Sequence, residues 1–343
     1  MITRSRFLQV LAGGAGALAL AGCGAQKAAD AGDEGKKDAA AEPVAVRAAA
    51  LKGPTAMGLV KFMSEVDAGN LKDEDYSFQI LASADEVAPL ISKSEADIAA
   101  VPANLASVLY NKTSGAVRVI AVNTLGVLYI CELGDTVNTV ADLRGKTIFS
   151  AGKGATPEYA LEYVLRANGL DPAADVTIEW KSEHAECVAA LAQDATAIAM
   201  LPQPFVTTAQ AKNDQIRVAL DLNQEWAAAC EAEGRDGKLI TGVAVVRSEF
   251  ADAHPEAVDA FLGHYRESVE FVNANTDEAA ALVGGYDIVP EAVAKKALPA
   301  CNITFIDGAD MKAQLGGYLE VLADQNAEAV GGKLPGDDFY YGA

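Results

Sequence analysis

KTIFSAGKGATPEYALEYVLRANGL, residues 146–170, is the stretch that decides the fold. Its first five residues predict a β-strand, and a glycine-containing loop leads from that strand into a helix. Thr156 is a suitable N-cap with Pro157 at the first helical position, and Asn168-Gly169 predicts the end of the helix. The stretch is therefore predicted to be a strand–loop–helix unit of an α/β protein.

The same plan occurs twice in the chain. The stretch above continues into a strand, a helix and a third strand that ends at Pro202, predicted over residues 176–180, 185–192 and 195–201. An earlier segment has the same order and ends its third strand at Pro102, with strands over residues 44–51, 76–81 and 97–101 and helices from residue 54 and over residues 85–92. Alternating strands and helices predict parallel sheets covered by helices.

Two apolar segments are predicted to connect these units. One covers residues 117–131 and the other residues 240–246. The first predicts strands and a turn because polar or small residues interrupt it, namely Arg118, Asn123, Thr124 and Gly126.

These connections predict two lobes, of which one is discontinuous. Lobe 1 is expected to contain residues 44–128 and 240–343, and lobe 2 residues 129–239. Residues 254–273 show the clearest helical period, and residues 227–238 are predicted to be a surface loop or helix. The expected fold class is α/β, with a ligand cleft between the lobes beyond the carboxyl ends of the strands.

The first residues predict export. Arg4 and Arg6 form a basic start, residues 7–20 are uncharged and mostly apolar, and small residues precede Cys23. This order is typical of a secretory signal, and the apolar run is too short for a spanning helix. Because Ser5 stands where a twin-arginine signal has its second arginine, both the general and the twin-arginine export routes stay open.

The end of the signal, Leu20-Ala21-Gly22-Cys23, resembles the lipobox of bacterial lipoproteins. The resemblance implies a signal peptide over residues 1–22, lipid on Cys23, and a protein anchored to the outer face of the cell membrane. The alternative is an ordinary cleaved signal in which Cys23 is incidental. Residues 23–43 lack large apolar side chains and are predicted to form a flexible tether.

Charge and cysteine content limit the possible functions. The formal net charge is −21, which argues against nucleic acid as a partner and against a peripheral grip on anionic lipid. Cys131, Cys187, Cys230 and Cys301 contain no Cys-x-x-Cys pair, so disulfides and buried free thiols both remain open.

Several short motifs carry a resemblance to a known family. They are Lys52-Gly53-Pro54-Thr55, Ala96-Asp97-Ile98-Ala99, Val140-Ala141-Asp142-Leu143-Arg144-Gly145-Lys146, His254-Pro255-Glu256, and the tail over residues 334–341. In this order they resemble the taurine, alkylsulfonate, nitrate and thiamine-precursor group of periplasmic binding proteins, from residue 44 to the C-terminus. The resemblance implies a type II two-lobed fold, and a monomer that delivers a small molecule to an ABC permease with its cytoplasmic ATPase.

The resemblance also nominates ligand-binding residues in the loops at strand ends. On lobe 1 these are Lys52, Gly53, Pro54, Thr55, Pro102, Asn104, Thr124 and Gly126. On lobe 2 they are Gly152, Lys153, Gly154, Ala155, Thr156, Pro202 and Gln203. For each glycine a tight turn without ligand contact is an equal alternative, and Thr156 is expected to cap its helix in either case.

The charge of the ligand can be predicted from the two helix starts. Helices expected to begin at Pro54 and Thr156 present unpaired N–H groups, and Lys52 and Lys153 lie beside them. Such an arrangement favours an acidic group, for example a sulfonate, carboxylate or phosphate. The alternative is a neutral or cationic heterocycle with both lysines in solvent.

Other functions have weaker support. An enzyme of thiamine-pyrimidine synthesis shares the predicted fold, but His184 and Cys187 are two possible metal ligands without a third nearby in sequence. The chain has no Gly-x-Ser-x-Gly nucleophile elbow. We therefore predict no catalytic residue, cofactor or metal. A lipoprotein that presents its ligand to a sensor remains an alternative to import.

Overall fold

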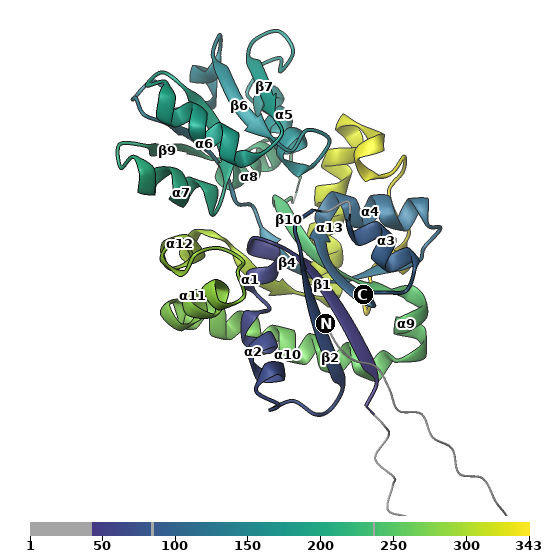
Figure 1. Ribbon diagram of the computed structural model, residues 1–343. Helices are drawn as coiled ribbons and strands as arrows, with labels where there is room; N and C mark the ends of the chain where they lie inside the picture. Colours follow the sequence, from purple (N-terminus) through teal and green to yellow (C-terminus); the bar gives the residue numbers. More distant parts are fainter. Residues whose placement is uncertain (1–42, 84–85, 236) are drawn as a thin grey trace, which may run out of the picture. The chain divides into compact units, whose positions relative to one another are not determined.

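Two β-sheets organise the described part of the chain (Figure 1). The computed structural model describes residues 43–83, 86–235 and 237–343, which lie in one compact unit, Pro43–Ala343. Sheet A contains six strands in the spatial order β11 (Ile303–Ile306), β4 (Val117–Leu125), β10 (Ile240–Arg247), β3 (Ile98–Pro102), β1 (Ala45–Leu51) and β2 (Asp75–Leu81). Sheet B contains five in the order β7 (Thr177–Lys181), β6 (Thr147–Ala151), β8 (Ile198–Pro202), β5 (Leu128–Glu132) and β9 (Arg217–Asp221). The predicted α/β class is confirmed.

The two sheets repeat one topology. In sheet A, β1 lies parallel to β2 and β3, and β10 is inserted antiparallel between β3 and β4. In sheet B, β6 lies parallel to β7 and β8, and β5 is inserted antiparallel between β8 and β9. The predicted repeat of one unit is therefore confirmed. In each sheet the inserted strand comes from outside that repeat.

Helices cover both faces of each sheet. One face of sheet A carries α1 (Pro54–Met57), α2 (Val60–Asp67), α9 (Ser248–Ala253), α10 (Pro255–Ala274), α11 (Thr276–Gly285) and α12 (Glu291–Ala297). Its other face carries α3 (Val87–Ser92), α4 (Ala103–Lys112) and α13 (Gly308–Gln325). Sheet B is covered by α5 (Thr156–Ala167) and α8 (Leu222–Ala232) on one face, and by α6 (His184–Gln193) and α7 (Phe205–Lys212) on the other.

The alternation of strand side chains explains these layers. In β1, Ala48 and Ala50 pack toward α2 and α10, whereas Ala49 joins the core on the α4 side. Successive side chains of a strand point to opposite faces, so a strand buried on both sides is apolar at every position. The runs in β3 and β10 follow the same rule, which is why the sequence shows them as continuous apolar segments.

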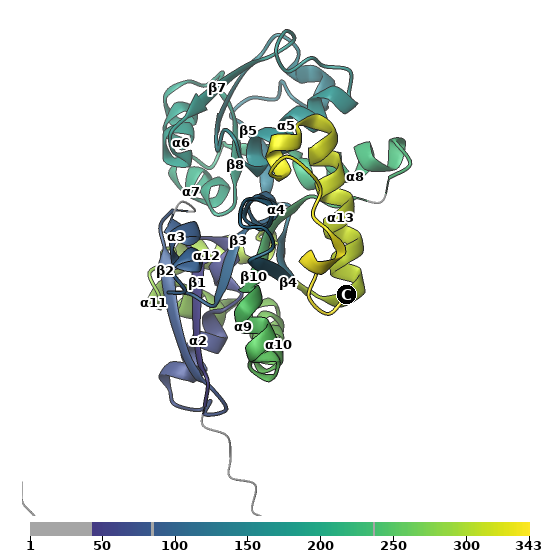
Figure 2. The ribbon, with the colours of Figure 1, turned by 90° about the vertical axis from the view of Figure 1, so that its right-hand side faces the viewer.

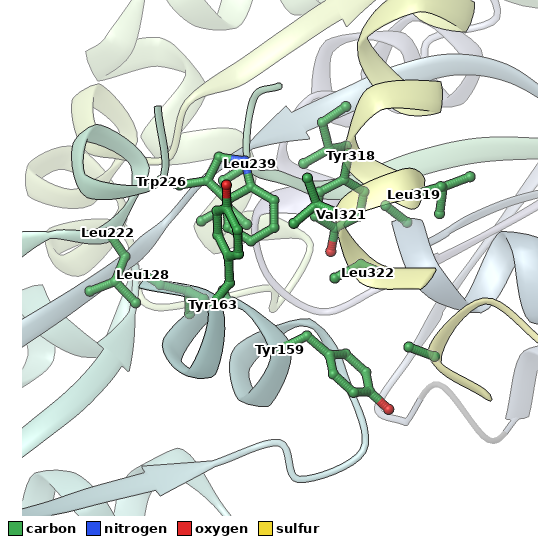
Figure 3. Packing of buried hydrophobic residues seen from close by; sticks show 14 of the residues in the cluster. Leu128, Tyr159, Tyr163, Leu222, Trp226, Leu239, Tyr318, Leu319, Val321 and Leu322 are labelled. Atoms are coloured by element: carbon green, nitrogen blue, oxygen red, sulfur yellow. The ribbon is translucent and has the colours of Figure 1, made fainter. Parts of the chain in front are cut away.

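Helix α13 joins the two sheets. It follows β11 of sheet A and contacts β4, yet it also packs against α5 of sheet B (Figure 2). Tyr163 of α5, Trp226 of α8 and Tyr318 of α13 pack in sequence with tilted rings, and the ring centroids are 4.5 Å apart for the first pair and 5.5 Å for the second (Figure 3). One hydrophobic core therefore continues from sheet A into sheet B.

Residues 227–238 follow the expectation of a surface loop or helix, since α8 continues to Ala232 and most of the described side chains here are exposed, with Ala229 and Cys230 buried. Two other sequence expectations need correction. Residues 240–246 were expected to be a crossing, but they form β10 inside sheet A, and residues 233–239 make the connection. The helix from Pro54 is interrupted, since α1 ends at Met57 and α2 begins at Val60.

The cysteines in the described part of the chain are buried and reduced. Cys131, Cys187, Cys230 and Cys301 are all free thiols, so the disulfide alternative is not realised in this structure. Burial raises the pKa of Cys131 and Cys301 to about 12, which keeps both as thiols.

The export signal and the tether lie outside the described residues, and so does Cys23. In the described ranges, no helix combines the length and apolar character needed to cross a bilayer. The predicted lobe boundaries stay a prediction.

Candidate functional site

The carboxyl ends of the parallel strands in both sheets meet at one place. Because β10 is antiparallel to both β3 and β4, the end of β4 lies at the same edge as the ends of β1 and β3. The start of β5 lies at the corresponding edge of sheet B, since β5 is antiparallel to β8. Only Gly126 and Val127 separate β4 from β5. We call these two edges, joined by that crossing, the facing edges.

The first predicted loop follows β1. Gly53 has a φ of 122°, which favours glycine, and its carbonyl accepts from the N–H groups of Ala56 and Met57. The Thr55 hydroxyl donates to the Leu51 carbonyl at 3.0 Å and is nearly buried. Nζ of Lys52 lies 3.0 Å from the Asp287 carboxylate. The Lys52 charge is therefore already paired. Pro54 is half-buried.

Sheet A brings several nominated residues into one row. Pro102 pairs with Gly242 of β10, and Gly242 pairs with Thr124 of β4. A Cβ atom on Gly242 would lie 2.5 Å from Oδ1 of Asn123 and 2.6 Å from Cγ2 of Thr55. The absence of a side chain at Gly242 thus allows Thr55, Asn123 and Thr124 to approach one another at this edge.

The crossing is held by side chains from both sides. The Gly126 carbonyl accepts from Nδ2 of Asn302, whose own carbonyl accepts from the Leu125 N–H at 3.1 Å. A Cβ atom on Gly126 would lie 2.7 Å from Oδ1 of Asn223, the second residue of α8. Gly126 is therefore needed for close packing at the crossing, which is the structural alternative to ligand contact.

The second predicted loop leads into α5. Gly152 and Gly154 have φ values of 88° and 79°. Lys153 is exposed, and the Gly154 N–H donates to Oε2 of Glu158 at 2.6 Å. The expected capping role of Thr156 is wrong. Ala155 occupies the N-cap, and α5 has no side-chain cap, because Thr156 already lies inside the helix.

Thr156 directs its hydroxyl to other elements instead. Its Oγ1 lies 3.1 Å from the Tyr318 hydroxyl of α13 and 3.4 Å from Oδ1 of Asn104 in α4. All three side chains are buried, with Asn104 6% exposed and Tyr318 fully covered. Asn104, from a helix of sheet A, and Thr156, from a helix of sheet B, were both nominated, and the structure brings them together.

The last nominated pair follows β8. Pro202 is half-buried and pairs with Leu128 at the start of β5. The Gln203 N–H donates to the Val127 carbonyl at 2.9 Å, and its Oε1 accepts from the Thr207 hydroxyl at 2.9 Å. Gln203 therefore connects the crossing to α7, and its side-chain oxygen is already engaged in that structural role.

Acidic groups also lie at the facing edge of sheet B. Asp221 pairs with Tyr129 across β9 and β5, and its Oδ1 accepts from the Asn223 N–H at 2.9 Å. Burial, followed by the Asp221 charge, raises the pKa of Glu225 above its ordinary value. The same two causes raise the pKa of Tyr129 to about 12, so its hydroxyl stays protonated and donates to the Ala300 carbonyl at 3.1 Å. A cation or a hydrogen-bond donor suits this part of the edge.

A cavity of about 440 Å³ lies away from the facing edges, between α5, α8 and α13. Two arginines line it. Arg166 donates to Gln325 at 3.0 Å and pairs with Glu162, and Arg235 pairs with Asp324 at 2.7 Å and with Glu233. Both guanidinium groups are already paired with residues of the protein. We therefore interpret this cavity as a packing boundary between α13 and sheet B.

The two residues weighed as metal ligands do not form a metal centre. Burial lowers the pKa of His184 to about 4, and burial chiefly raises the pKa of Cys187 to about 11. The Cys187 Sγ contacts the Glu183 carbonyl at 3.9 Å. Across the described ranges, no three His, Cys, Asp or Glu side chains gather as a metal site.

Some residues at the site were not nominated from the sequence. Asn123 was noted only as an interruption of an apolar run, although a polar residue at the end of a buried strand is a usable signal. Tyr318 and Asn223 had no such signal. Their positions depend on the packing of α13 and α8, which sequence periodicity does not determine.

The sequence matches a known protein family. The family model described as NMT1/THI5 like matches residues 62–279 of the 343-residue chain. This chain belongs to the NMT1/THI5-like family. The resemblance predicted from the sequence motifs is thus confirmed.

Solved structures show the same fold for this NMT1/THI5-like protein. An ABC transporter protein from Parabacteroides distasonis is 20% identical, with a TM-score of 0.72 over 87% of this chain and 98% of that chain. The periplasmic aliphatic sulphonate binding protein of Escherichia coli is 16% identical, with a TM-score of 0.68 over 87% and 91%. The periplasmic nitrate-binding protein of Synechocystis PCC 6803 is 14% identical, with a TM-score of 0.55 over 74% and 69%. No curated protein sequence matches. At these identities the likeness establishes the two-lobed periplasmic-binding-protein fold.

Proposed function

We propose that this protein is an extracytoplasmic solute-binding lipoprotein that captures a small molecule between its two lobes and delivers it to an ABC importer. The observation that carries the proposal is the pair of facing edges. Both end in strand–helix junctions, and polar side chains from the two sheets meet there, as Asn104 and Thr156 do. Clefts at the carboxyl ends of strands are the usual ligand sites of α/β sheets. The structures that share the fold include sulphonate- and nitrate-binding proteins.

We propose that the ligand carries an acidic group, held at the start of α5. This helix has 12 residues, and the positive end of its dipole, at the N-terminus, attracts anions. Lys153 lies in the preceding loop and is exposed. The junction after β1 contributes less, because α1 has four residues and Lys52 is paired with Asp287. Asp221 and Glu225 favour a second, hydrogen-bond-donating group on the ligand.

Calorimetry with a defined panel tests the ligand class. Ethanesulfonate, nitrate and phosphate represent anions, and a cationic aminopyrimidine represents the thiamine-precursor alternative. We expect an anion to bind with one-to-one stoichiometry. Binding of the aminopyrimidine alone would show that the ligand is not anionic. Mass spectrometry of compounds that co-purify with the protein then identifies the natural ligand.

We further propose that residues 44–128 with 240–343 form one lobe and residues 129–239 the other, and that the lobes close over the ligand. Tighter binding to the closed form shifts the population toward it. Small-angle scattering should show a smaller radius of gyration for the monomer when a panel compound binds. Identical curves for free and bound protein would instead indicate a rigid, preformed site.

Membrane attachment through Cys23 is a separate part of the proposal. It rests on the Leu20-Ala21-Gly22-Cys23 sequence. Replacing Cys23 by serine should move the protein from the membrane fraction of its host into the soluble fraction. A Cys23→Ser variant that still sediments with membranes after a salt wash would contradict lipid anchoring.

Import and sensing remain distinguishable by experiment. If the protein serves import, proteoliposomes that contain the permease and ATPase should accumulate the bound compound only when this protein is present. Unchanged uptake without the protein would favour the sensing role.

A further inference from the structure

A short chain of hydroxyl and amide groups connects three helices at the facing edges. Tyr318 of α13, Thr156 of α5 and Asn104 of α4 are its members, with 3.1 Å between the first two polar atoms and 3.4 Å between the second two. Each side chain is at least nine-tenths buried. The three residues are far apart in sequence, so the contact exists only because α13 crosses from sheet A to sheet B.

The direction of the hydrogen bonds follows from the chemistry of the groups. Oδ1 of Asn104 can only accept, so the single proton of Thr156 is donated to it. Oγ1 of Thr156 must then accept from Tyr318. Burial raises the pKa of the Tyr318 hydroxyl, which therefore keeps the proton that it donates.

This direction leaves one polar group of Asn104 available. Its carboxamide oxygen is occupied by Thr156, and within the described residues no hydrogen bond engages Nδ2. An amide nitrogen only donates, so a partner at this position must be a hydrogen-bond acceptor.

We propose that Tyr318 is a positioning residue that, through Thr156, holds the start of α5 against α4 and orients Asn104 as a hydrogen-bond donor to an acceptor group of the ligand. The inference deepens the proposed function and rests on it for the ligand. Tyr318 lies on neither strand-end loop, so the residue acts on the site from outside it. A sulfonate, carboxylate or phosphate oxygen meets the requirement for an acceptor.

The chain offers a matched control. Tyr163 belongs to the same aromatic cluster as Tyr318, and both rings contact Trp226 (Figure 3). The Tyr163 hydroxyl, however, bonds to Glu233 at 3.1 Å and contacts Cys230. Tyr318→Phe and Tyr163→Phe therefore each remove one buried hydroxyl and keep the ring, but only the first breaks the link to Thr156.

Backbone hydrogen exchange tests the positioning role without any ligand. In Tyr318→Phe the amides of Glu158 and Tyr159, which donate to the Ala155 carbonyl in the first turn of α5, should exchange roughly fivefold faster, the change expected for one lost hydrogen bond. Tyr163→Phe should leave this segment unchanged. Unaltered exchange in Tyr318→Phe, or an equal increase in both variants, would overturn the proposal.

A double-mutant cycle separates positioning from general packing. Thr156→Val removes the middle hydroxyl and keeps the branched shape, so Tyr318→Phe should add no further increase in exchange when both changes are combined. Thr156→Ser retains the hydroxyl and should restore slow exchange. Additive effects of Tyr318→Phe and Thr156→Val would show that the two groups act independently, against the proposal.

Asn104→Asp tests the donor assignment. The new carboxylate can still accept from Thr156, but it replaces the donor Nδ2 by a charged acceptor. Binding of ethanesulfonate should weaken at least roughly tenfold, as for loss of a hydrogen bond to a charged group. Asn138→Asp adds the same charge at an exposed position beyond the other end of β5 and should have no such effect. The assignment of Asn104 as a donor would be reversed by two results together. The unaltered protein would bind no anion, and Asn104→Asp would bind a cationic aminopyrimidine more tightly than the unaltered protein does.

Failure of the proposed ligand class and failure of the positioning role of Tyr318 can be told apart. If the unaltered protein binds none of the panel anions, the proposed ligand class fails. The exchange experiment uses free protein and decides the positioning chain by itself.

Discussion

Sheets A and B follow one plan, yet their strand–helix junctions differ. After β1, the helix lasts from Pro54 to Met57 and Lys52 is paired with Asp287. After β6, α5 continues for 12 residues and Lys153 is exposed. A helix dipole requires several aligned turns, so of these two junctions the one after β6 is better suited to an anion. Equal topology therefore does not imply equal chemistry.

The two inserted strands, β10 in sheet A and β5 in sheet B, also differ. In β10, Gly242 pairs with Pro102 and leaves room for Thr55 and Asn123. At the matching place in sheet B, Leu128 pairs with Pro202 and is buried. At this place sheet A therefore has room for compact polar side chains, whereas sheet B has a buried leucine.

The largest contrast concerns one buried carboxylate in each sheet. Asp97 accepts hydrogen bonds from Arg47 and Arg247, whereas Glu132 accepts from Arg217 and from the Thr136–Val137 segment. Asp97→Asn would leave two cations around a neutral amide, and we expect a loss of about 3 kcal/mol in the free energy of unfolding. Glu132→Gln should cost about 1–2 kcal/mol, because Arg217 retains Asp135 at 3.2 Å. Urea unfolding measures both values, and a greater loss for Glu132→Gln would contradict the comparison.

A smaller contrast concerns the histidines. His264, on the sheet A side, bonds to Asp73 at 2.7 Å, whereas within the described residues Nδ1 of His184, beside sheet B, is buried without a partner. Burial lowers the pKa of His184 from 6.5 to about 4. Between these values the unfolded chain binds a proton that the folded chain does not, so stability should fall as the pH is lowered through this window.

His184→Gln should make the melting temperature less dependent on pH between about 6.5 and 4. His264→Gln serves as the control and should leave that part of the slope in place. An unchanged slope in His184→Gln would show that its imidazole is accessible to protons in the folded protein.

The smallest expected effect concerns the two lysines. Lys153→Ala should weaken ethanesulfonate binding roughly two- to fivefold, the range for one charge near a helix terminus. Lys52→Ala should leave the affinity unchanged, since its charge is paired with Asp287. Calorimetry at low and high salt measures both. A greater effect of Lys52→Ala would place the anion at the junction of sheet A instead.

Much of the fold could be predicted because the information is local. Apolar runs of strand length, Pro102 and Pro202 at strand ends, and the helix signals after Gly152 lie within a few residues of the elements they define. The repeated order of these signals was sufficient to predict two α/β units. The nominated loops do lie along the facing edges, and their ligand contacts stay a prediction.

The contacts that the sequence did not predict depend on distant packing. Trp226 and Tyr318, almost one hundred residues apart, pack together with ring centroids 5.5 Å apart. The Thr156 hydroxyl was expected to cap its own helix because that partner is local. Its actual partners, Asn104 and Tyr318, come from other helices, and only the three-dimensional contact shows them.

The crossing of α13 between the sheets has a consequence for the order of synthesis. Every strand and helix of sheet B has been made by residue 232, but Tyr318, Val321 and Leu322 complete the core around Trp226 (Figure 3). A ribosome adds these residues well after α8 is complete. The nascent sheet B therefore keeps an apolar face uncovered until α13 has been made.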